Sequence, residues 1–331
     1  MKKEFIPYRQ EDHGSFDEEW LQHKDASGWW YITGYFNDNA HLENLYSYQF
    51  TVINPHLFGL SPYVLQLAVT DVQTGQHLFR QQMKLGGKDI YVGKTTVNFG
   101  EMAHLERKED CMVLTAKTDV FEFALALNKG KGATWHGDNG VLVMGMPQKP
   151  KERTVYYSYT NMPTTGHVTF AAEDGSQKSM DINGKSWFDR QWGPYHLVDN
   201  YTHWEWFSLR FFDDEEVMLF AFPQDPYYDG TFIGKNKERK LVRNYTYTPK
   251  QFVEVNGMSF SKGWDLTMPG IKEEEYEIRP LTEGQLNLAY FELIAEVINL
   301  KGKRVGYCIV ELLPGARNPD KKIGMDLFKK V

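Results

Sequence analysis

Gly184-Lys185-Ser186-Trp187-Phe188-Asp189-Arg190-Gln191-Trp192-Gly193 is the stretch on which the interpretation of this sequence depends. It sets a carboxylate, an arginine and an amide among large aromatic rings, which are common in cores and pockets. If the stretch is a strand, its two faces carry Trp187, Asp189 and Gln191 on one side and Phe188, Arg190 and Trp192 on the other. Asp189 is therefore a candidate pocket acid; the alternative is a salt-bridged or turn-capping aspartate that closes a domain.

The composition favours a β protein with an internal cavity. The 331 residues include 21 Phe, 19 Tyr and 9 Trp, and such residues are frequent in strands and in lined pockets. The length exceeds what one hydrophobic core usually organises, so we expect two domains. The net charge of −7 argues against nucleic acid or an anionic membrane as partner and favours a small apolar ligand.

Several classes of site and segment are missing from the sequence. Its two cysteines, Cys111 and Cys308, are too few for a disulfide framework or a multi-cysteine metal site. The histidines are scattered singly, and the usual nucleotide, zinc-protease and serine-hydrolase motifs are absent. We expect no cofactor, no metal, no secretory signal, no stable membrane insertion and a cytoplasmic location. The sequence makes no prediction of oligomeric state.

Short runs of alternating residues, separated by Gly, Asn, Asp and Pro, predict strands and few helices. After a polar N-terminal arm over 1–27, the predicted strands cover 29–36, 46–53, 63–71, 112–118, 120–127, 141–146, 154–160, 167–172, 203–211, 217–222 and 305–312. Residues 286–300 are also predicted as strand, with a helix over 286–299 as the competing interpretation. The glycine-rich residues 130–140 are predicted as a loop, in which His136 is either part of an anchored tip or a ligand contact.

Glu205 lies on an apolar face of the predicted strand 203–211. It shares that face with Phe207 and Leu209, whereas Trp206 lies on the other face. A carboxylate in such a place either pairs with a cation or has a pKa raised by desolvation. We expect the pairing, because it is the commoner case.

Several motifs together resemble the lipocalin-like family of carotenoid 1,2-hydratase (hydroxyneurosporene synthase) and the AttH-type proteins. They lie at 135–140, 156–160, 165–166, 184–193, 204–209 and 306–312, and the most specific is Trp-Phe-Asp-Arg-Gln-Trp-Gly at 187–193. The resemblance runs from about Trp29 to Leu312. It implies two consecutive lipocalin-like antiparallel β-barrel domains, residues 1–197 and 198–331, and a cavity for an apolar molecule near the domain junction.

The resemblance also implies site residues. The family's motif aspartate falls on Asp189 and the aromatic residue two places before it on Trp187, which makes these two the catalytic candidates. Where the hydratases have a His-x-Trp pair, this chain has Tyr157-Ser158-Tyr159. The candidate substrate-binding residues are Trp192, Gln191, Glu205, Trp206, Tyr157, Tyr159, His136 and Gln49.

The family includes hydratases, kievitone-hydratase-like proteins and fungal pericyclases, so it predicts the type of pocket more firmly than the reaction. We expect an acid-assisted addition of water to an alkene of a terpenoid or polyene-like molecule. Asp189 is the expected acid, and Trp187 and Trp192 are expected to hold the resulting cation by their π faces. The alternatives are a non-catalytic carrier of an apolar metabolite, and a pericyclase or isomerase that works by folding its substrate.

Overall fold

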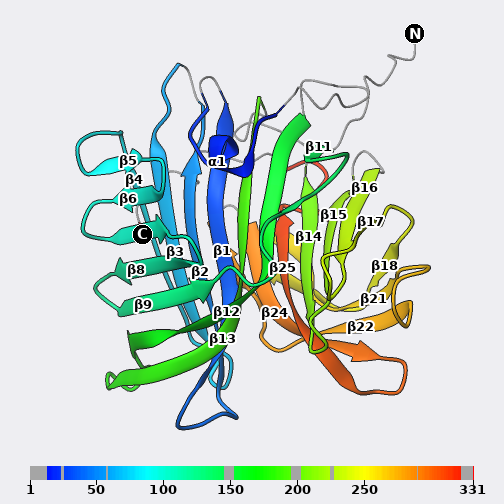
Figure 1. The fold of residues 1–331 in the computed structure, drawn as a ribbon. Coiled ribbons are helices and arrows are strands. Elements are labelled where there is room, and N and C mark those ends of the chain that lie inside the picture. The colour runs from blue at the N-terminus through cyan, green and yellow to red at the C-terminus, as the bar shows by residue number, and fades with distance from the viewer. Residues whose placement is uncertain are drawn as a thin grey trace. The chain divides into compact units, whose positions relative to one another are not determined.

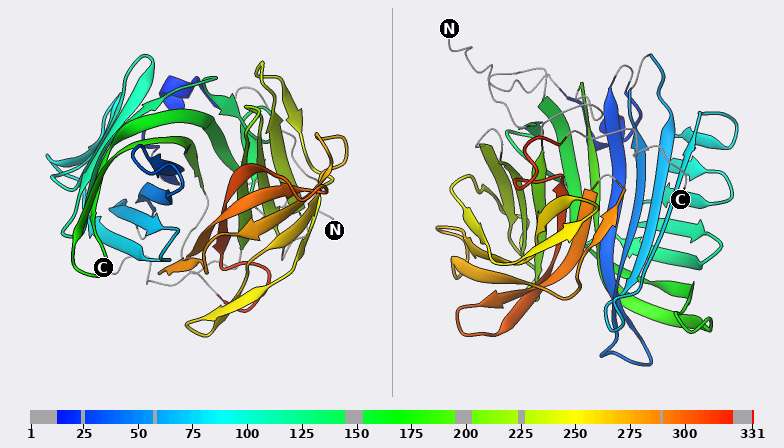
Figure 2. Two further views of the ribbon diagram at one scale, coloured as in Figure 1. Left: turned by 90° about the horizontal axis from the view of Figure 1, so that it is seen from below. Right: turned by 180° about the vertical axis from the view of Figure 1, so that it is seen from behind.

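A computed structural model describes residues 13–23, 26–56, 59–144, 153–194, 203–223, 227–288, 290–321 and 331. They form two compact units (Figures 1 and 2). The N-terminal unit contains described residues from 13 to 135 and from 155 to 194, with Val331. The C-terminal unit contains those from 136 to 154 and from 203 to 321. The predicted boundary between residues 197 and 198 lies outside the described residues, so the domain bounds stay a prediction.

The N-terminal unit is one antiparallel sheet that curls around its own core (Figure 2). Its strands follow the order β4-β3-β2-β1-β13-β12-β9-β8-β7-β6-β5, and β10 pairs with β12. The elements are α1 (Phe16–Glu19), β1 (Ser27–Asp38), β2 (Leu45–Asn54), β3 (Tyr63–Asp71), β4 (His77–Lys84), β5 (Ile90–Val92), β6 (Thr96–Phe99), β7 (Ala103–Arg107), β8 (Cys111–Lys117), β9 (Phe121–Asn128), β10 (Thr134–Trp135), β12 (Arg153–Ala171) and β13 (Gln177–Gly193).

The C-terminal unit repeats this scheme with a second curled sheet. Its strands follow the order β17-β16-β15-β14-β25-β24-β22-β21-β18, β23 pairs with β24, and β19 and β20 form a separate hairpin. The elements are β11 (Val141–Val143), β14 (Trp204–Phe211), β15 (Glu216–Phe222), β16 (Tyr227–Ile233), β17 (Arg239–Leu241), β18 (Thr246–Pro249), β19 (Phe252–Val255), β20 (Met258–Ser261), β21 (Trp264–Thr267), β22 (Glu275–Pro280), β23 (Gln285–Asn287), β24 (Tyr290–Asn299) and β25 (Arg304–Leu313).

This architecture confirms the predicted fold class of two lipocalin-like antiparallel barrel domains with little helix. The competing helix over 286–299 is wrong, because β23 and β24 occupy that range. Two predicted strands, 154–160 and 167–172, are parts of the single strand β12, whose pairing with β13 shifts between Tyr159 and Met162. The predicted loop 130–140 includes the two-residue strand β10.

The burial of side chains distinguishes strands that are covered on one face from strands that are covered on both faces. In β9 buried and exposed residues alternate strictly, so one face meets the core and the other meets water. In β3 and β14 every residue is buried. The sheet face that lies away from the barrel core is therefore also shielded from water around these strands, and it is this second buried face that carries the candidate site.

A buried arginine joins the N-terminal segment to the core of the N-terminal unit. The fully buried Arg190 guanidinium lies over the Trp30 ring, with its carbon 4.2 Å from the ring centroid. It donates to the backbone carbonyl oxygens of Trp20 at 3.3 Å and Leu21 at 2.6 Å, just after α1. Buried charge is tolerated where hydrogen bonds satisfy it, so Arg190 ties the N-terminal segment to the barrel. No helix in the described part of the chain is long and apolar enough to span a membrane.

Candidate functional site

The motif residues lie on β13, which runs between β1 and β12 in the N-terminal sheet (Figure 1). Phe188 belongs to the hydrophobic core of this unit, together with Tyr157 and Tyr159. Because neighbouring residues of a strand point to opposite faces, Trp187, Asp189 and Gln191 lie on the face away from that core. This is the alternation that the sequence predicts.

Three side chains hold the Asp189 carboxylate. The Trp187 indole N–H donates to Oδ1 at 2.6 Å, and the Ser158 hydroxyl donates to the same oxygen. The Tyr156 hydroxyl donates to Oδ2 at 2.9 Å. Asp189 is 4% exposed. The three hydrogen bonds fix the position of this carboxyl group. Burial disfavours its anion whereas the donated hydrogen bonds favour it, so the two effects oppose each other.

Polar side chains continue from Asp189 across the neighbouring strands. Asp189 is in register with Tyr31 on β1, Tyr31 with Thr51 on β2, and Thr51 with Gln66 on β3. Each of these residues is at least 95% buried. The Gln66 Nε2 donates to the Gln81 side chain, and its Oε1 has no hydrogen-bond partner among the described residues. Buried polar groups are costly without partners, so this row is suited to polar contacts.

Gln49, a predicted substrate-binding residue, lies in the adjacent row. It is paired across β2 and β1 with Thr33, and Thr33 with Trp187. Its Nε2 donates to Thr51 Oγ1 at 2.7 Å. The structure thus brings Gln49, Trp187, Asp189 and Gln191 to one buried sheet face, although these residues come from strands far apart in the sequence.

Three other predicted residues lie on the opposite, core side of the same sheet. Tyr157 and Tyr159 pack against Phe188 inside the barrel, with ring centroids 6.2 and 6.0 Å from it. Trp192 stacks on His23 and donates to Glu19 Oε2 at 2.6 Å. The structure does not place these rings beside Asp189, so Trp192 is not positioned to hold a cation that forms there.

The sequence interpretation missed Tyr156 and Ser158, which contact Asp189 directly. They alternate with Tyr157 and Tyr159 along β12, so choosing those two tyrosines selected the other face. The register between β12 and β13, which puts Ser158 opposite Asp189, would have identified these two residues. This register depends on how the two strands pair and cannot be deduced from the sequence of β12 alone.

The remaining predicted residues, His136, Glu205 and Trp206, belong to the C-terminal unit. His136 is completely buried, and its burial together with the nearby Arg239 lowers its pKa well below the usual value, so the ring is neutral. Trp206 is buried on the sheet face away from the core of this unit, in register with Phe220.

Glu205 faces the core of the C-terminal unit, as the sequence predicts, since it has the phase of Phe207 and Leu209. Its Oε1 accepts a hydrogen bond from the Ala316 backbone N–H at 3.0 Å. Burial raises the pKa of the carboxyl group. No cation lies within ion-pair distance of Glu205 in the described part of the chain, so the pairing that we expect is not found.

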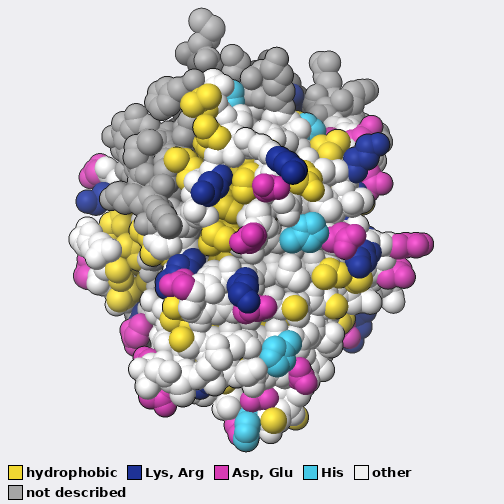
Figure 3. Space-filling model, turned by 90° about the vertical axis from the view of Figure 1, so that its left-hand side faces the viewer, with side chains coloured by type: hydrophobic (Ala, Val, Ile, Leu, Met, Phe, Trp, Pro, Cys, Tyr) yellow, Lys and Arg dark blue, Asp and Glu magenta, His cyan; other side chains and the backbone are white. Residues whose placement is uncertain are grey.

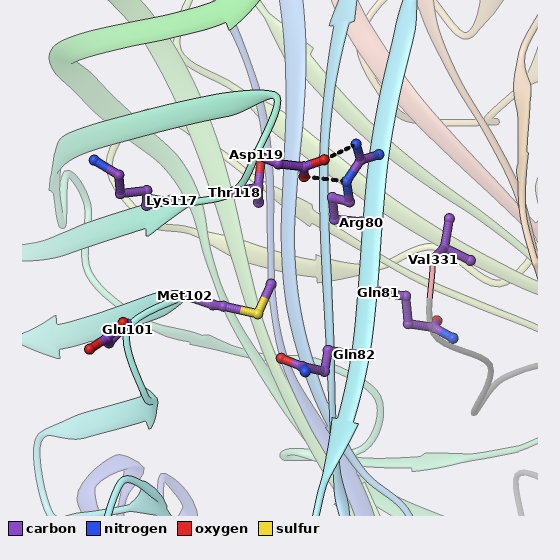
Figure 4. A pocket seen from close by; sticks show the side chains of 9 residues that line it. All are labelled: Arg80, Gln81, Gln82, Glu101, Met102, Lys117, Thr118, Asp119 and Val331. Carbon is purple, nitrogen blue, oxygen red and sulfur yellow. Dashed lines mark hydrogen bonds and ion pairs between the residues drawn. The ribbon is translucent and has the colours of Figure 1, made fainter.

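The N-terminal unit also has an open groove of about 590 Å³. Figure 3 shows one face of the molecule, on which hydrophobic and charged side chains are mixed. Figure 4 shows the residues that line the groove, which are Arg80, Gln81, Gln82, Glu101, Met102, Lys117, Thr118, Asp119 and Val331. Arg80 donates two hydrogen bonds to Asp119, at 2.6 and 2.7 Å, and Gln81 exchanges two backbone hydrogen bonds with Val331. Arg80 and Asp119 thus satisfy each other, and the groove is open rather than buried, so it is a weaker candidate than the Asp189 face.

Two curled antiparallel sheets, each with its own core, define a lipocalin-like protein of the two-barrel class. The chain belongs to the AttH-like family, whose model matches residues 7–315. No protein with a curated function matches the sequence. In the described residues no group of three or more His, Cys, Asp or Glu side chains is placed to hold a metal ion.

Solved structures of low sequence identity share this fold. The crystal structure of an AttH protein from Nitrosomonas europaea is 18% identical, with a TM-score of 0.79, and the match covers 94% of this chain and 99% of that one. Kievitone hydratase from Nectria haematococca is 17% identical, with a TM-score of 0.67 over 87% of this chain and 89% of that one. CghA is 10% identical, with a TM-score of 0.54 over 88% and 89%.

Proposed function

We propose that this protein is an enzyme of the hydratase type, in which Asp189 is the acid that protonates an alkene of an apolar, terpenoid or polyene-like molecule. The observation that carries the proposal is a buried carboxyl group held by Trp187, Ser158 and Tyr156 on a polar sheet face. A general acid must be fixed in position to be effective. The likeness of the fold to a hydratase supports the same reaction class.

The hydrogen bonds indicate which oxygen of Asp189 carries the proton. An indole N–H can only donate, so Oδ1 must act as an acceptor toward Trp187. A tyrosine hydroxyl can donate or accept, so the contact between Tyr156 and Oδ2 at 2.9 Å is compatible with a proton on Oδ2. We therefore assign the transferable proton of the neutral acid to Oδ2.

The reaction balances with this single acid. The Asp189 proton forms a C–H bond with one alkene carbon as the π bond breaks, and the oxygen of a water molecule bonds to the other carbon. The water then loses a proton to the Asp189 carboxylate, which restores the acid. In this proposal, polar residues of the same sheet face, among them Gln49 and Gln191, hold the water or a polar group of the substrate.

A non-catalytic carrier is the second candidate, and the same three hydrogen bonds support it. They would equally hold a carboxylate whose only role is to join β12 and β13, because donated hydrogen bonds stabilise the anion. In that case a ligand would bind without chemical change.

Heavy-oxygen water distinguishes these functions before the substrate is known. The protein is incubated with a terpenoid and polyene extract in H₂¹⁸O, and products are followed by untargeted mass spectrometry. A hydratase incorporates one ¹⁸O and converts a compound into its water adduct; a cyclase or isomerase changes retention without changing mass; a carrier changes nothing. We expect the labelled adduct with the wild-type protein.

The variant Asp189→Asn tests the role of the acid. An amide fills the same space but is not a useful acid, so formation of the labelled adduct should fall by about 10²–10⁴ while the melting temperature changes little. The matched control is Asp181→Asn, because Asp181 lies on the same strand with its side chain 78% exposed. An Asp189→Asn variant that melts earlier and still forms the adduct would assign Asp189 to structure.

A further inference from the structure

We propose that the outer face of the β12–β13 hairpin carries a second active site, in which Ser179 is a nucleophile that hydrolyses small esters, His167 is its base and Asp181 orients the base. This site is independent of the reaction proposed at Asp189. Asp181 precedes Asp189 by eight residues on β13, which corresponds to about 26 Å along a strand that rises about 3.3 Å per residue.

The pairing of β12 with β13 brings the three side chains together. His167 lies opposite Asp181, and Thr169 lies opposite Ser179. The residues that alternate with them belong to the hydrophobic core of the N-terminal unit: Val168, Phe170, Met180 and Ile182. Since neighbouring residues of a strand point to opposite faces, the other set points outward. His167, Ser179 and Asp181 are accordingly exposed.

The hydrogen bonds link a carboxylate, an imidazole and a hydroxyl in that order. His167 Nδ1 lies 2.9 Å from Asp181 Oδ1, and His167 Nε2 lies 2.9 Å from Ser179 Oγ. An ionised carboxylate only accepts, so Nδ1 carries the proton of the neutral ring. Nε2 is then an acceptor, and the Ser179 hydroxyl donates to it. A nucleophile that is bonded to a base, with a carboxylate orienting the base, is the arrangement that activates a serine.

Thr169 holds the Ser179 oxygen in place. Its Oγ1 lies 3.2 Å from Ser179 Oγ. Because Ser179 has one hydroxyl proton and donates it to His167, Thr169 is the donor in this contact. The Ser179 oxygen is therefore held by two side chains of β12, and a fixed nucleophile is a more effective one.

A backbone N–H beside the nucleophile can stabilise the oxyanion that forms during acyl transfer. The Asp181 carbonyl oxygen accepts from the Asn39 N–H at 2.9 Å, so the backbone groups of Asp181 point away from β12. Those of Ser179, two residues earlier, have the same orientation. On that side β1 ends at Asp38, opposite Ile182. Among the residues that the structure describes, no backbone carbonyl accepts from the Ser179 N–H, which can therefore donate to an oxyanion.

A shallow hollow of about 130 Å³ next to these residues can receive the acyl group. Ala124, which lines it, lies directly opposite His167 in the pairing of β9 with β12. Its other outward-facing side chains are His104, Thr115, Lys117 and Glu122. Lys117 and Glu122 pair with each other at 2.8 Å, so the hollow suits an uncharged group. Pockets for drug-sized ligands measure about 300–1,000 Å³, and the acyl chain must therefore be short.

The reaction needs only the ester and water. Ser179 Oγ bonds to the carbonyl carbon while its proton moves to His167 Nε2. The bond between that carbon and the alcohol oxygen breaks, and the alcohol leaves with the proton. Water then attacks the acyl group and gives a proton to Nε2. The bond to Ser179 Oγ breaks, the carboxylic acid leaves, and the proton returns to Ser179.

The hydrolysis of p-nitrophenyl acetate, followed by the absorbance of p-nitrophenolate, tests the proposal. We expect Ser179→Ala to lower kcat/KM at least about 10²-fold without changing the melting temperature, because Ser179 is exposed. The matched control is Ser176→Ala, since Ser176 is also exposed but donates to Asp174 at 2.6 Å and not to a histidine. A fluorophosphonate, which reacts with activated serines, should label Ser179 and leave Ser176 unlabelled.

Variants of the other two residues test their separate roles. His167→Asn should lose both ester hydrolysis and labelling, whereas His41→Asn should keep both, because His41 is exposed and pairs with Glu43 at 3.7 Å. Asp181 is a positioning residue. In Asp181→Asn an amide N–H faces Nδ1, so the ring proton moves to Nε2, and kcat should fall while KM changes little. Asp181→Glu, which keeps the carboxylate, should recover part of kcat.

Asp181→Asn also separates this site from that of Asp189, since it should keep the ¹⁸O-labelled water adduct and lose ester hydrolysis. The proposal is overturned if Ser179→Ala hydrolyses the ester as fast as the wild type, or if the fluorophosphonate labels no residue or one other than Ser179. It is also overturned if His167→Asn is as active as His41→Asn. A surface hydrogen-bond network without reactivity gives all of these results.

Discussion

Replacing Arg190 by lysine is expected to destabilise the N-terminal unit strongly, although the charge is kept. The guanidinium donates to the carbonyl oxygens of Trp20 at 3.3 Å, Leu21 at 2.6 Å, Trp29 at 3.4 Å and Gln191 at 2.8 Å, and lies over Trp30. Burial lowers its pKa to about 10, so it stays protonated at neutral pH. A lysine ammonium lacks the planar fork that reaches several carbonyl groups at once.

The expected loss follows from the two short hydrogen bonds and the ring contact. A lysine can keep one short bond and lose the other, at about 1.5–3 kcal/mol for a hydrogen bond to a charged group. A weaker ring contact adds about 0.5–2 kcal/mol. The sum, about 2–5 kcal/mol, is a large part of the roughly 5–15 kcal/mol by which domains are usually stable.

Urea unfolding followed by tryptophan fluorescence measures this loss as a lower midpoint at unchanged slope. The matched control is Arg80→Lys, in the same unit, whose guanidinium pairs with the exposed Asp119; an exposed pair is worth about 0–1 kcal/mol. If Arg190→Lys is as stable as Arg80→Lys, the guanidinium does not tie the N-terminal segment to the barrel and the reasoning is refuted.

Three further changes test the two units. Gly184→Ala should cost about 1–3 kcal/mol in thermal unfolding, because the new Cβ would lie 2.1 Å from the Tyr35 carbonyl oxygen; an unchanged melting temperature would contradict this close approach. Glu205→Gln should remove a loss of stability that begins as the pH rises above about 4.5, since burial raises the folded pKa. The native state holds a proton there that the unfolded chain releases, and the slope is at most about 1.4 kcal/mol per pH unit; parallel melting curves for both proteins would refute it. Trp187→Phe removes an indole N–H that can only donate to Asp189 and so favours the neutral form of the carboxyl group; the decline of hydratase activity with rising pH should move to higher pH, and a shift to lower pH would contradict the acid role.

Alternation along single strands was enough to predict much of the fold. In β9 the buried and exposed residues alternate, and such a pattern identifies both the strand and its inner face. β12 shows why other features could not be predicted. Pro163 and Gly166 indicate a break, but the chain continues through a shift in register. Gly166 is required because β9 approaches so closely that a Cβ would lie 2.1 Å from the Ala124 carbonyl oxygen, and close approach between strands is not visible in one sequence.

The candidate site was predictable only in part for the same physical reason. Residues 154–160 of β12 are all buried, so hydrophobicity does not distinguish the two faces, and a choice of face can be wrong by one residue. Tyr157 and Tyr159 fall where the hydratases have a His-x-Trp pair, whereas Tyr156 and Ser158 hold Asp189. On β13 the question of the inner face does not arise, because residues two apart in a strand share a face. Asp189 therefore lies beside Trp187 whichever face is buried in the barrel.

The two buried carboxyl groups show that burial alone does not determine the chemistry of an acid. Asp189 is 4% exposed and Glu205 is 1% exposed. Asp189 accepts hydrogen bonds from three side chains, whereas the partners of Glu205 are the Ala316 backbone N–H and the Tyr247 hydroxyl. Each donated hydrogen bond offsets part of the cost of desolvating the anion. The environment of Asp189 therefore favours a fixed orientation, and that of Glu205 favours the neutral form. Since the donors to Asp189 include two residues more than 30 positions earlier in the chain, strand pairing decides which of these roles a carboxyl group can fill.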